Sequence, residues 1–119
     1  MFQKNSFSIP SDSSGILLVK VIQTRRCSTT QHAKIGKFLR VVLRNMLPEL
    51  IKKKKKRSRS IVIRTKHQYF TKKQKYYQFL DNALVLLKKR MNSTGKELYG
   101  STSKFLKIKK FRIAYKYIY

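Results

Sequence analysis

The sequence predicts a mainly β fold, either a small barrel or a sandwich. Short runs rich in β-branched residues recur along the chain, and turn clusters separate them. The length of 119 residues is enough for one hydrophobic core. A hydrophobic content of 41% supports a folded body, although the high charge favours disorder. We therefore expect a single domain that spans residues 1–119.

The amino-terminal half is expected to supply three strands. Residues 16–22 follow a turn cluster and are dense in Val, Ile and Leu, so they predict the first strand. The polar and basic residues 25–37 predict a loop. Residues 38–43 predict the second strand, which is not expected to continue through Pro48. Residues 60–64 predict the third strand.

The carboxy-terminal half is expected to add two strands, at residues 76–79 and 83–87. A short helix is predicted over residues 101–110, because a serine can cap its start and apolar side chains recur at helical spacing. Residues 111–115 return to strand character. Residues 96–119 are therefore expected to form a helix and strand extension of the domain.

The aliphatic side chains of these strands are the candidate core. Those expected to line a barrel interior are Ile16, Leu18, Val19, Val21, Val41, Val42, Ile61, Ile63, Ala83 and Val85. The four glycines are expected at backbone turns. We expect these residues to have a structural role and to bind no ligand.

The charge of the chain predicts its partner. Thirty lysines and arginines stand against four acids, for a formal net charge of +26. Repulsion on this scale opposes compaction and favours a polyanionic partner. Tyr, Phe and Ile interrupt the basic stretches, as in a folded nucleic-acid-binding domain. We therefore expect nucleic acid as the partner, ahead of a membrane or an acidic protein.

Enzymatic chemistry finds little support in the sequence. The acids are scattered, at Asp12, Glu49, Asp81 and Glu97, so no pair suggests acid–base catalysis. Cys27 has no second cysteine, and with two distant histidines it makes no zinc pattern. The longest apolar run, residues 83–87, is far shorter than the roughly 20 residues that span a bilayer. We expect no catalysis, cofactor, metal, small-molecule substrate or membrane.

Five sequence blocks resemble the motifs of a known family. They are Asp12-Ser-Ser-Gly15, Ala33-Lys-Ile-Gly36, Ile61-Val-Ile-Arg-Thr-Lys66, Phe79-Leu-Asp-Asn-Ala-Leu-Val-Leu-Leu87 and Gly95-Lys-Glu-Leu-Tyr-Gly100. In this order and spacing they resemble the universal large-subunit ribosomal protein fourteen family, in its bacterial and organellar form. The resemblance covers nearly the whole chain.

The sequence departs from the family motifs mainly by losing acidic residues, several of which are replaced by basic ones. Lys37 stands where the family has an acid, and Lys56-Arg57-Ser58 replaces its Lys-Gly-Asp. Lys73-Gln74 replaces the Asp-Gly turn of its middle hairpin. Loss of acids in favour of lysine is expected of a divergent form that is embedded in RNA.

The resemblance implies a five-stranded β-barrel with long basic hairpin loops and a short carboxy-terminal helical segment. It also implies a structural constituent of the large ribosomal subunit that binds large-subunit rRNA and touches neighbouring ribosomal proteins. At the intersubunit face, such a protein contributes to a bridge with small-subunit rRNA. The alternative is a free-standing, basic nucleic-acid-binding regulator or RNA chaperone.

Basic side chains in the expected loops are the candidate RNA contacts. The foremost is the basic loop at residues 52–59, where lysine supplies point charge and arginine can fork onto a phosphate; a solvated loop or a nuclear-localisation tract is the alternative. The expected RNA-binding residues are Arg25, Arg26, Lys34, Lys37, Lys52, Lys53, Lys54, Lys55, Lys56, Arg57, Arg59, Arg64, Lys66, Lys72 and Lys73.

Composition suggests where the protein works. Lysine outnumbers arginine, tyrosine and isoleucine are plentiful, and tryptophan is absent, as A/T-rich codons would give. Residues 1–14 lack the apolar core of a secretory signal and the arginine-rich character of a transit peptide. We expect an organelle-encoded protein of the mitochondrial matrix, within the mitoribosome, ahead of a plastid or an A/T-rich bacterium. Chance bias in a small basic protein is the alternative.

Overall fold

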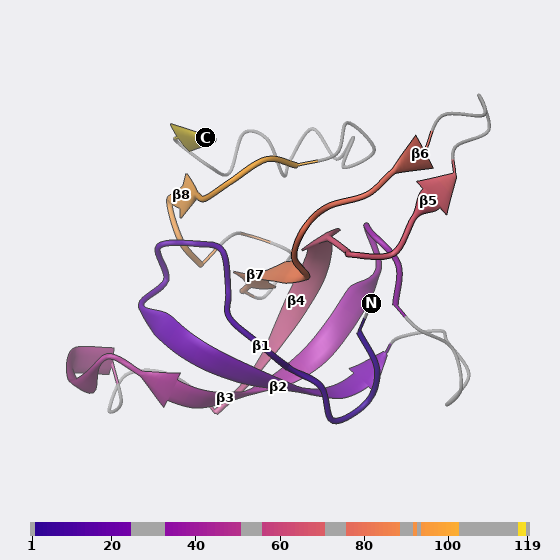
Figure 1. Ribbon diagram of the computed structural model, residues 1–119. Coiled ribbons are helices and arrows are strands. Elements are labelled where there is room, and N and C mark those ends of the chain that lie inside the picture. Colours follow the sequence, from indigo (N-terminus) through magenta and orange to yellow (C-terminus); the bar gives the residue numbers. More distant parts are fainter. Residues whose placement is uncertain are drawn as a thin grey trace.

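The computed structural model describes residues 2–24, 33–50, 56–70, 76–88, 92, 94–102 and 117–118. Five strands form one antiparallel sheet in the order β1-β2-β3-β4-β7, which curls into a half-barrel (Figure 1). The strands are β1 (Phe7–Ser8), β2 (Ile16–Thr24), β3 (Phe38–Met46), β4 (Arg57–Arg64) and β7 (Ala83–Leu87). Helix is limited, within the described residues, to a single 3-10 turn, η1 (Pro48–Leu50). The predicted mainly β, five-stranded architecture is confirmed.

Two small sheets accompany the half-barrel. Strands β5 (Tyr69–Phe70) and β6 (Tyr76–Tyr77) pair antiparallel, and Figure 1 shows this hairpin projecting from the main sheet. Strands β8 (Glu97–Leu98) and β9 (Tyr117–Ile118) pair in parallel. The hairpin falls where the resemblance placed it, but β6 is shorter than the strand predicted at 76–79.

The two edges of the main sheet meet through the residues that follow β1. Pro10 forms a parallel bridge with Leu84 of β7, and the Ser11 N–H donates to the Leu84 carbonyl at 2.9 Å. The Leu86 N–H then donates to Asp12 Oδ2 at 3.2 Å. The segment that leaves β1 therefore runs along β7 and joins the first and last strands of the half-barrel.

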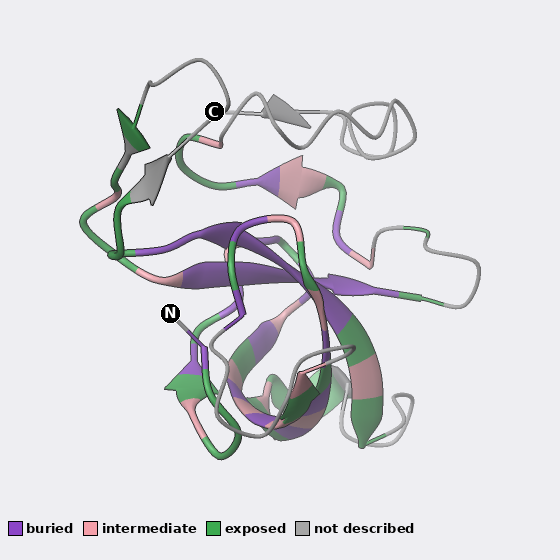
Figure 2. Cartoon of the chain, turned by 90° about the vertical axis from the view of Figure 1, so that its right-hand side faces the viewer, coloured by how far each residue is buried: buried purple, intermediate pink, exposed green. Residues whose placement is uncertain are grey.

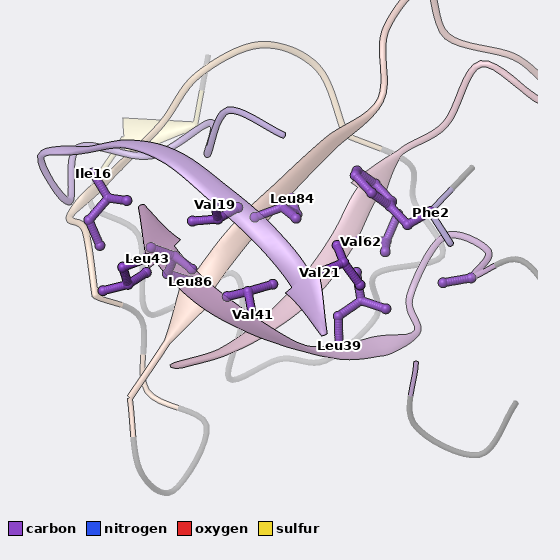
Figure 3. Close-up of a cluster of buried hydrophobic side chains, with 11 residues drawn as sticks. Phe2, Ile16, Val19, Val21, Leu39, Val41, Leu43, Val62, Leu84 and Leu86 are labelled. Atoms are coloured by element: carbon purple, nitrogen blue, oxygen red, sulfur yellow. The ribbon is translucent and has the colours of Figure 1, made fainter. Parts of the chain in front are cut away.

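One hydrophobic cluster fills the concave side of the sheet (Figure 3). Its buried members are Phe2, Ile16, Val19, Val21, Ala33, Leu39, Val41, Leu43, Val62, Leu84 and Leu86. Leu39, Val41 and Leu43 alternate along β3, as the two-residue period of a strand requires. In β2 the register shifts around Leu18, which leaves that side chain half-buried.

A second cluster lies on the opposite face of β4 and β7. Its buried members are Ile35, Ile61, Ile63, Ala83, Val85, Leu87 and Leu98, with Phe38 and Phe79 packed against them. Both faces are covered along β7 and along β4 from Ser60 to Arg64, and Figure 2 shows buried residues along two neighbouring strands. Side chains that alternate along a strand point to opposite faces, so Val62 and Leu84 face one cluster while Ile61 and Val85 face the other.

The sequence was wrong about several core positions for this reason. Ile61, Ile63, Ala83 and Val85 are buried, but in the second cluster rather than in the barrel interior. Val42 is half-buried because it alternates with Val41 on β3. Period-two patterning marks the two faces of a strand, but a strand that is buried on both faces carries no mark of which face is the interior.

Element boundaries also differ from the predictions. Arg57 and Arg59 belong to β4, where the sequence predicted a loop through residue 59, because their backbones pair with Val42 and Arg40 of β3. Strands β1 and β8 were not predicted. The helix expected at 101–110 and the strand expected at 111–115 fall almost entirely outside the described residues. No helix in the described part of the chain is long and apolar enough to cross a membrane.

Candidate nucleic-acid interface

Strand β3 places arginines on the outer face of the sheet. Because Leu39, Val41 and Leu43 point into the interior cluster, Arg40 and Arg44 point away from it, and both are exposed. Phe38, on the same outer side, packs against the second cluster. The outer surface of β3 thus alternates apolar and basic side chains, in the order Phe38, Arg40, Val42 and Arg44.

The arginines of β3 and β4 form a regular cross-strand array. Gln23 pairs with Arg40, Arg40 with Arg59, and Arg59 with Leu87, so that one row crosses four strands. Two like charges that lie directly opposite one another repel, by a few tenths of a kcal/mol to about 1 kcal/mol. The Arg40–Arg59 pair is therefore an unfavourable arrangement unless an anion shares it.

A neighbouring row adds two further cations. Phe7 pairs with Lys20, Lys20 with Val42, and Val42 with Arg57. The Lys20 ammonium lies 5.6 Å from the centroid of the Phe7 ring, which is 58% exposed. This cation–π contact fixes the lysine and its aromatic partner on the outer face. We call Lys20, Arg40, Arg44, Arg57 and Arg59 the outer basic face.

The acids of the chain do not neutralise this face. Asp12 is buried and accepts from the Ser14 hydroxyl at 2.5 Å. Glu97 accepts from the Tyr99 hydroxyl at 3.4 Å, and Glu49 lies in η1. Among the residues that the structure describes, the one ion pair joins Arg64 and Asp81. Within the described residues, no acid therefore pairs with a cation of the outer basic face.

Arg64 was expected to bind RNA, but its side chain is directed into the protein. Its Nη1 donates to the Tyr99 carbonyl at 3.0 Å, and its Nη2 donates to Ser11 Oγ at 2.7 Å. Its Nε lies 3.2 Å from Asp81 Oδ1, an ion-pair distance, although this N–H makes no hydrogen bond to a described residue. The guanidinium is nine-tenths buried, which argues against contact with phosphate.

The position of the Arg64 side chain also explains why residue 100 is a glycine. Gly100 has a φ of +82°, and a Cβ built there would lie 1.8 Å from Arg64 Nη1. A side chain at position 100 would therefore displace the guanidinium. Arg64 and Gly100 together hold the segment around Tyr99 against the barrel.

Two of the sequence blocks meet at the same junction. Ser13 Oγ accepts from the backbone N–H groups of Lys96 and Glu97, each at 3.1 Å. A Cβ at Gly95 would lie 2.9 Å from the backbone nitrogen of Ser13. The turn after β1 and the segment of β8 are thus packed backbone to backbone, which explains why position 95 is glycine.

Comparison with known proteins agrees with this architecture. Residues 1–116 match the model of the family described as Ribosomal protein L14p/L23e. The chain belongs to this family. It is therefore a protein of the large ribosomal subunit, from a family with a structural rather than an enzymatic role, and its place is the ribosome.

The structure of this L14p/L23e member separates the predicted RNA-binding residues into three groups. Exposed and available are Lys34, Lys37, Lys56, Arg57, Arg59 and Lys66. Arg64 is buried. Outside the described residues lie Arg25, Arg26, Lys52, Lys53, Lys54, Lys55, Lys72 and Lys73.

Sequence reasoning missed three members of the outer basic face of this L14p/L23e protein. Lys20, Arg40 and Arg44 lie inside strands, whereas the predicted RNA contacts are basic residues of the expected loops and strand ends. The signal was present in residues 38–44, where arginine recurs on the face opposite the aliphatic side chains.

No metal centre accompanies the basic face in the described part of this family member. None of its described His, Cys, Asp and Glu side chains gather in groups of three that could hold an ion. His67 is exposed, whereas Cys27 and His32 lie outside the described residues. The chemistry that the described surface offers is the binding of anions by lysine and arginine.

Proposed function

We propose that this protein is a structural constituent of the large ribosomal subunit that binds large-subunit rRNA through its outer basic face and basic loops. The observation that carries the proposal is the direct opposition of Arg40 and Arg59, with Arg57 in the next row and no acid in contact. A sheet keeps such a pair when phosphates share the charge. Because the chain belongs to a ribosomal protein family, the polyanion of this proposal is rRNA.

The basic segment at residues 52–59, whose last residues belong to β4, and the exposed Lys34, Lys37 and Lys66 extend this surface in the proposal. The further partners are neighbouring ribosomal proteins and, at an intersubunit bridge, small-subunit rRNA. The support for these partners is the likeness of the sequence blocks to the family. The lysine-rich composition supports a mitochondrial ribosome, and recovery of the chain from purified mitochondrial large subunits would test that part.

Salt dependence tests the RNA-binding role. Each phosphate contact adds about 0.9 to the slope of log K against log salt for a duplex. Arg40→Gln and Arg59→Gln should each lower that slope by about one and weaken binding to a large-subunit rRNA fragment. Leu80→Ala, a change at a 97% exposed apolar side chain, is the control that should leave the slope unaltered. A slope that the double arginine variant does not change would contradict the proposal.

Retention on the ribosome separates this function from its alternative. A structural protein should stay with the large subunit when the particles are washed in high salt. A free-standing regulator or RNA chaperone should be released into the supernatant, since its contacts are mainly electrostatic. Sedimentation followed by detection of this chain distinguishes the two outcomes.

A further inference from the structure

One end of the half-barrel is filled, and the other is hollow. At the filled end Phe2 is 2% exposed and bridges Ala33, and Figure 3 shows it beside Val62 and Leu39. Ile16, Leu43 and Leu86 gather toward the opposite end in the same view. There they line a hollow of about 820 Å³. That volume lies within the range of about 300 to 1,000 Å³ found for pockets that hold small organic groups.

The lining of the hollow combines apolar and cationic side chains. Its apolar part comes from the interior cluster, from the half-buried Ile22 of β2 and from Leu87. Its basic part consists of Arg40, Arg57 and Arg59, which are exposed on the outer face, together with the exposed Lys88. None of the described residues that line it is acidic. The hollow therefore suits a ligand with an apolar, planar part and more than one negative charge.

The hollow can reach both faces of the sheet because β4 begins beyond the end of β7. Arg59 pairs with Leu87, the last residue of β7, and Ser58 Oγ donates to the Leu87 carbonyl at 3.1 Å. Arg57 and Ser58 extend past this pair along β3. Side chains of the interior and of the outer face thus border one space at this corner of the sheet.

We propose that the hollow receives an unpaired nucleotide of RNA, with its base against Leu43, Leu86 and Leu87 and its flanking phosphates on Arg40, Arg59 and Lys88. This rests on the proposed RNA-binding function and names what one part of the surface binds. Bases that leave a helix stack on aromatic rings or guanidinium planes, and their phosphates are bound by arginine and lysine. The described lining of the hollow supplies guanidinium planes beside aliphatic side chains. A fully paired RNA duplex offers phosphates but no free base. The protein should therefore bind RNA that contains an unpaired nucleotide more tightly than a fully paired duplex.

The first test compares two RNAs on the full-length protein. One is a short duplex with a single unpaired 2-aminopurine, and the other is the same duplex fully paired. Stacking of a base on an aromatic side chain contributes about 1–3 kcal/mol. The described lining of the hollow holds guanidinium and aliphatic groups instead, so we expect the bulged duplex to bind about five-fold more tightly, at the lower end of that range. The 2-aminopurine fluorescence should change on binding, since its surroundings change from water to the hollow.

Variants connect the preference to the hollow. Thr94 lines the hollow and is half-buried, so the larger side chain of Thr94→Trp should obstruct part of it and reduce the difference in affinity between the two RNAs. Arg40→Gln should reduce both the preference and the fluorescence change. Arg44→Gln is its matched control, because it removes one cation from the same face of β3 at a position that does not line the hollow. Arg44→Gln should weaken binding of both RNAs by a similar factor. The preference for the bulged duplex over the paired duplex should stay unchanged.

The outcomes separate this inference from the function on which it rests. If wild-type protein binds both RNAs equally, the nucleotide site is wrong while RNA binding stands. If it binds neither RNA, both ideas fall. If polyglutamate binds to wild type but not to Thr94→Trp, and the unpaired base gives no preference, the occupant is an acidic protein segment and the nucleotide is ruled out. Because Arg40 is exposed, its variant decides the matter even if Thr94→Trp does not fold.

Discussion

The role of Arg64 yields the sharpest prediction for stability. Replacing Arg64 by methionine keeps most of the apolar stem but removes every donor of the guanidinium. The Tyr99 carbonyl and the Ser11 hydroxyl would lose partners at 3.0 and 2.7 Å. A hydrogen bond to a charged group contributes about 1.5–3 kcal/mol. The ion pair with Asp81 adds little, because that carboxylate is 59% exposed.

Two such hydrogen bonds would sum to about 3–6 kcal/mol. Water can replace part of them, because Ser11 is half-buried and Tyr99 is exposed, so we expect Arg64→Met to lower the free energy of unfolding by about 2–4 kcal/mol. Urea denaturation followed by circular dichroism measures it. With a urea slope of about 1–3 kcal/mol per molar, the midpoint should fall by about 1–3 M. Arg59→Met is the matched control on the same strand, since Arg59 is exposed and its change should stay within about 0.5 kcal/mol.

RNA binding by the same two variants provides the complementary readout. Folded Arg64→Met should keep the wild-type salt slope, because its guanidinium does not face solvent, whereas Arg59→Met should lower the slope by about one. The reasoning would be refuted if Arg64→Met unfolded like wild type while its salt slope fell. That result would mean that Arg64 binds phosphate and that its contacts with Ser11 and Tyr99 contribute nothing.

Three further predictions concern the junction, the core and the basic loop. Gly95→Ala places a Cβ 2.9 Å from Ser13 N and should lower the unfolding free energy by about 1–3 kcal/mol in urea denaturation. Leu39→Ala, at a side chain 1% exposed, should cost about 2–5 kcal/mol by the same assay; Leu80→Ala, 97% exposed, should cost less than about 0.5 kcal/mol. Neutralising residues 52–57 removes up to six basic side chains, so the slope of log K against log salt should become shallower by several units while the thermal melt is retained. An unaltered slope would mean that this segment is solvated.

Much of the fold could be predicted because local patterns carry it. The β-branched runs that became β2, β3, β4 and β7 stand out against turn residues, and each of these four expected strands has a counterpart at that place. The strand expected at 111–115 lies outside the described residues. The starts of β2, at Ile16, and β3, at Phe38, match the predictions because a turn cluster or glycine precedes each one. The start of β4 at Arg57 was not visible, since arginine and serine extend a strand only when a partner strand supplies hydrogen bonds.

The sequence predicted that the candidate interface is basic, but it identified only some of the residues that form it. Charge alone indicated a polyanion, because thirty basic residues with four acids cannot neutralise one another. Which cations face outward depended on the neighbours of each strand. Arg40 and Arg59 are distant in sequence, and their opposition exists only in the register of β3 with β4. Arg64 looks like a surface cation in sequence, yet it is buried by Ser11 and Tyr99.

The sequence by itself determined the class of fold, the family and the sign of the partner's charge, because strand periodicity, short motifs and net charge are local or additive properties. Only the tertiary structure decided that Ile61 and Val85 belong to a second core, that Arg64 anchors the segment around Tyr99, and that one end of the half-barrel stays hollow. Each of these depends on contacts between residues far apart in the chain. Such contacts follow from sheet register and curvature, which no single segment encodes.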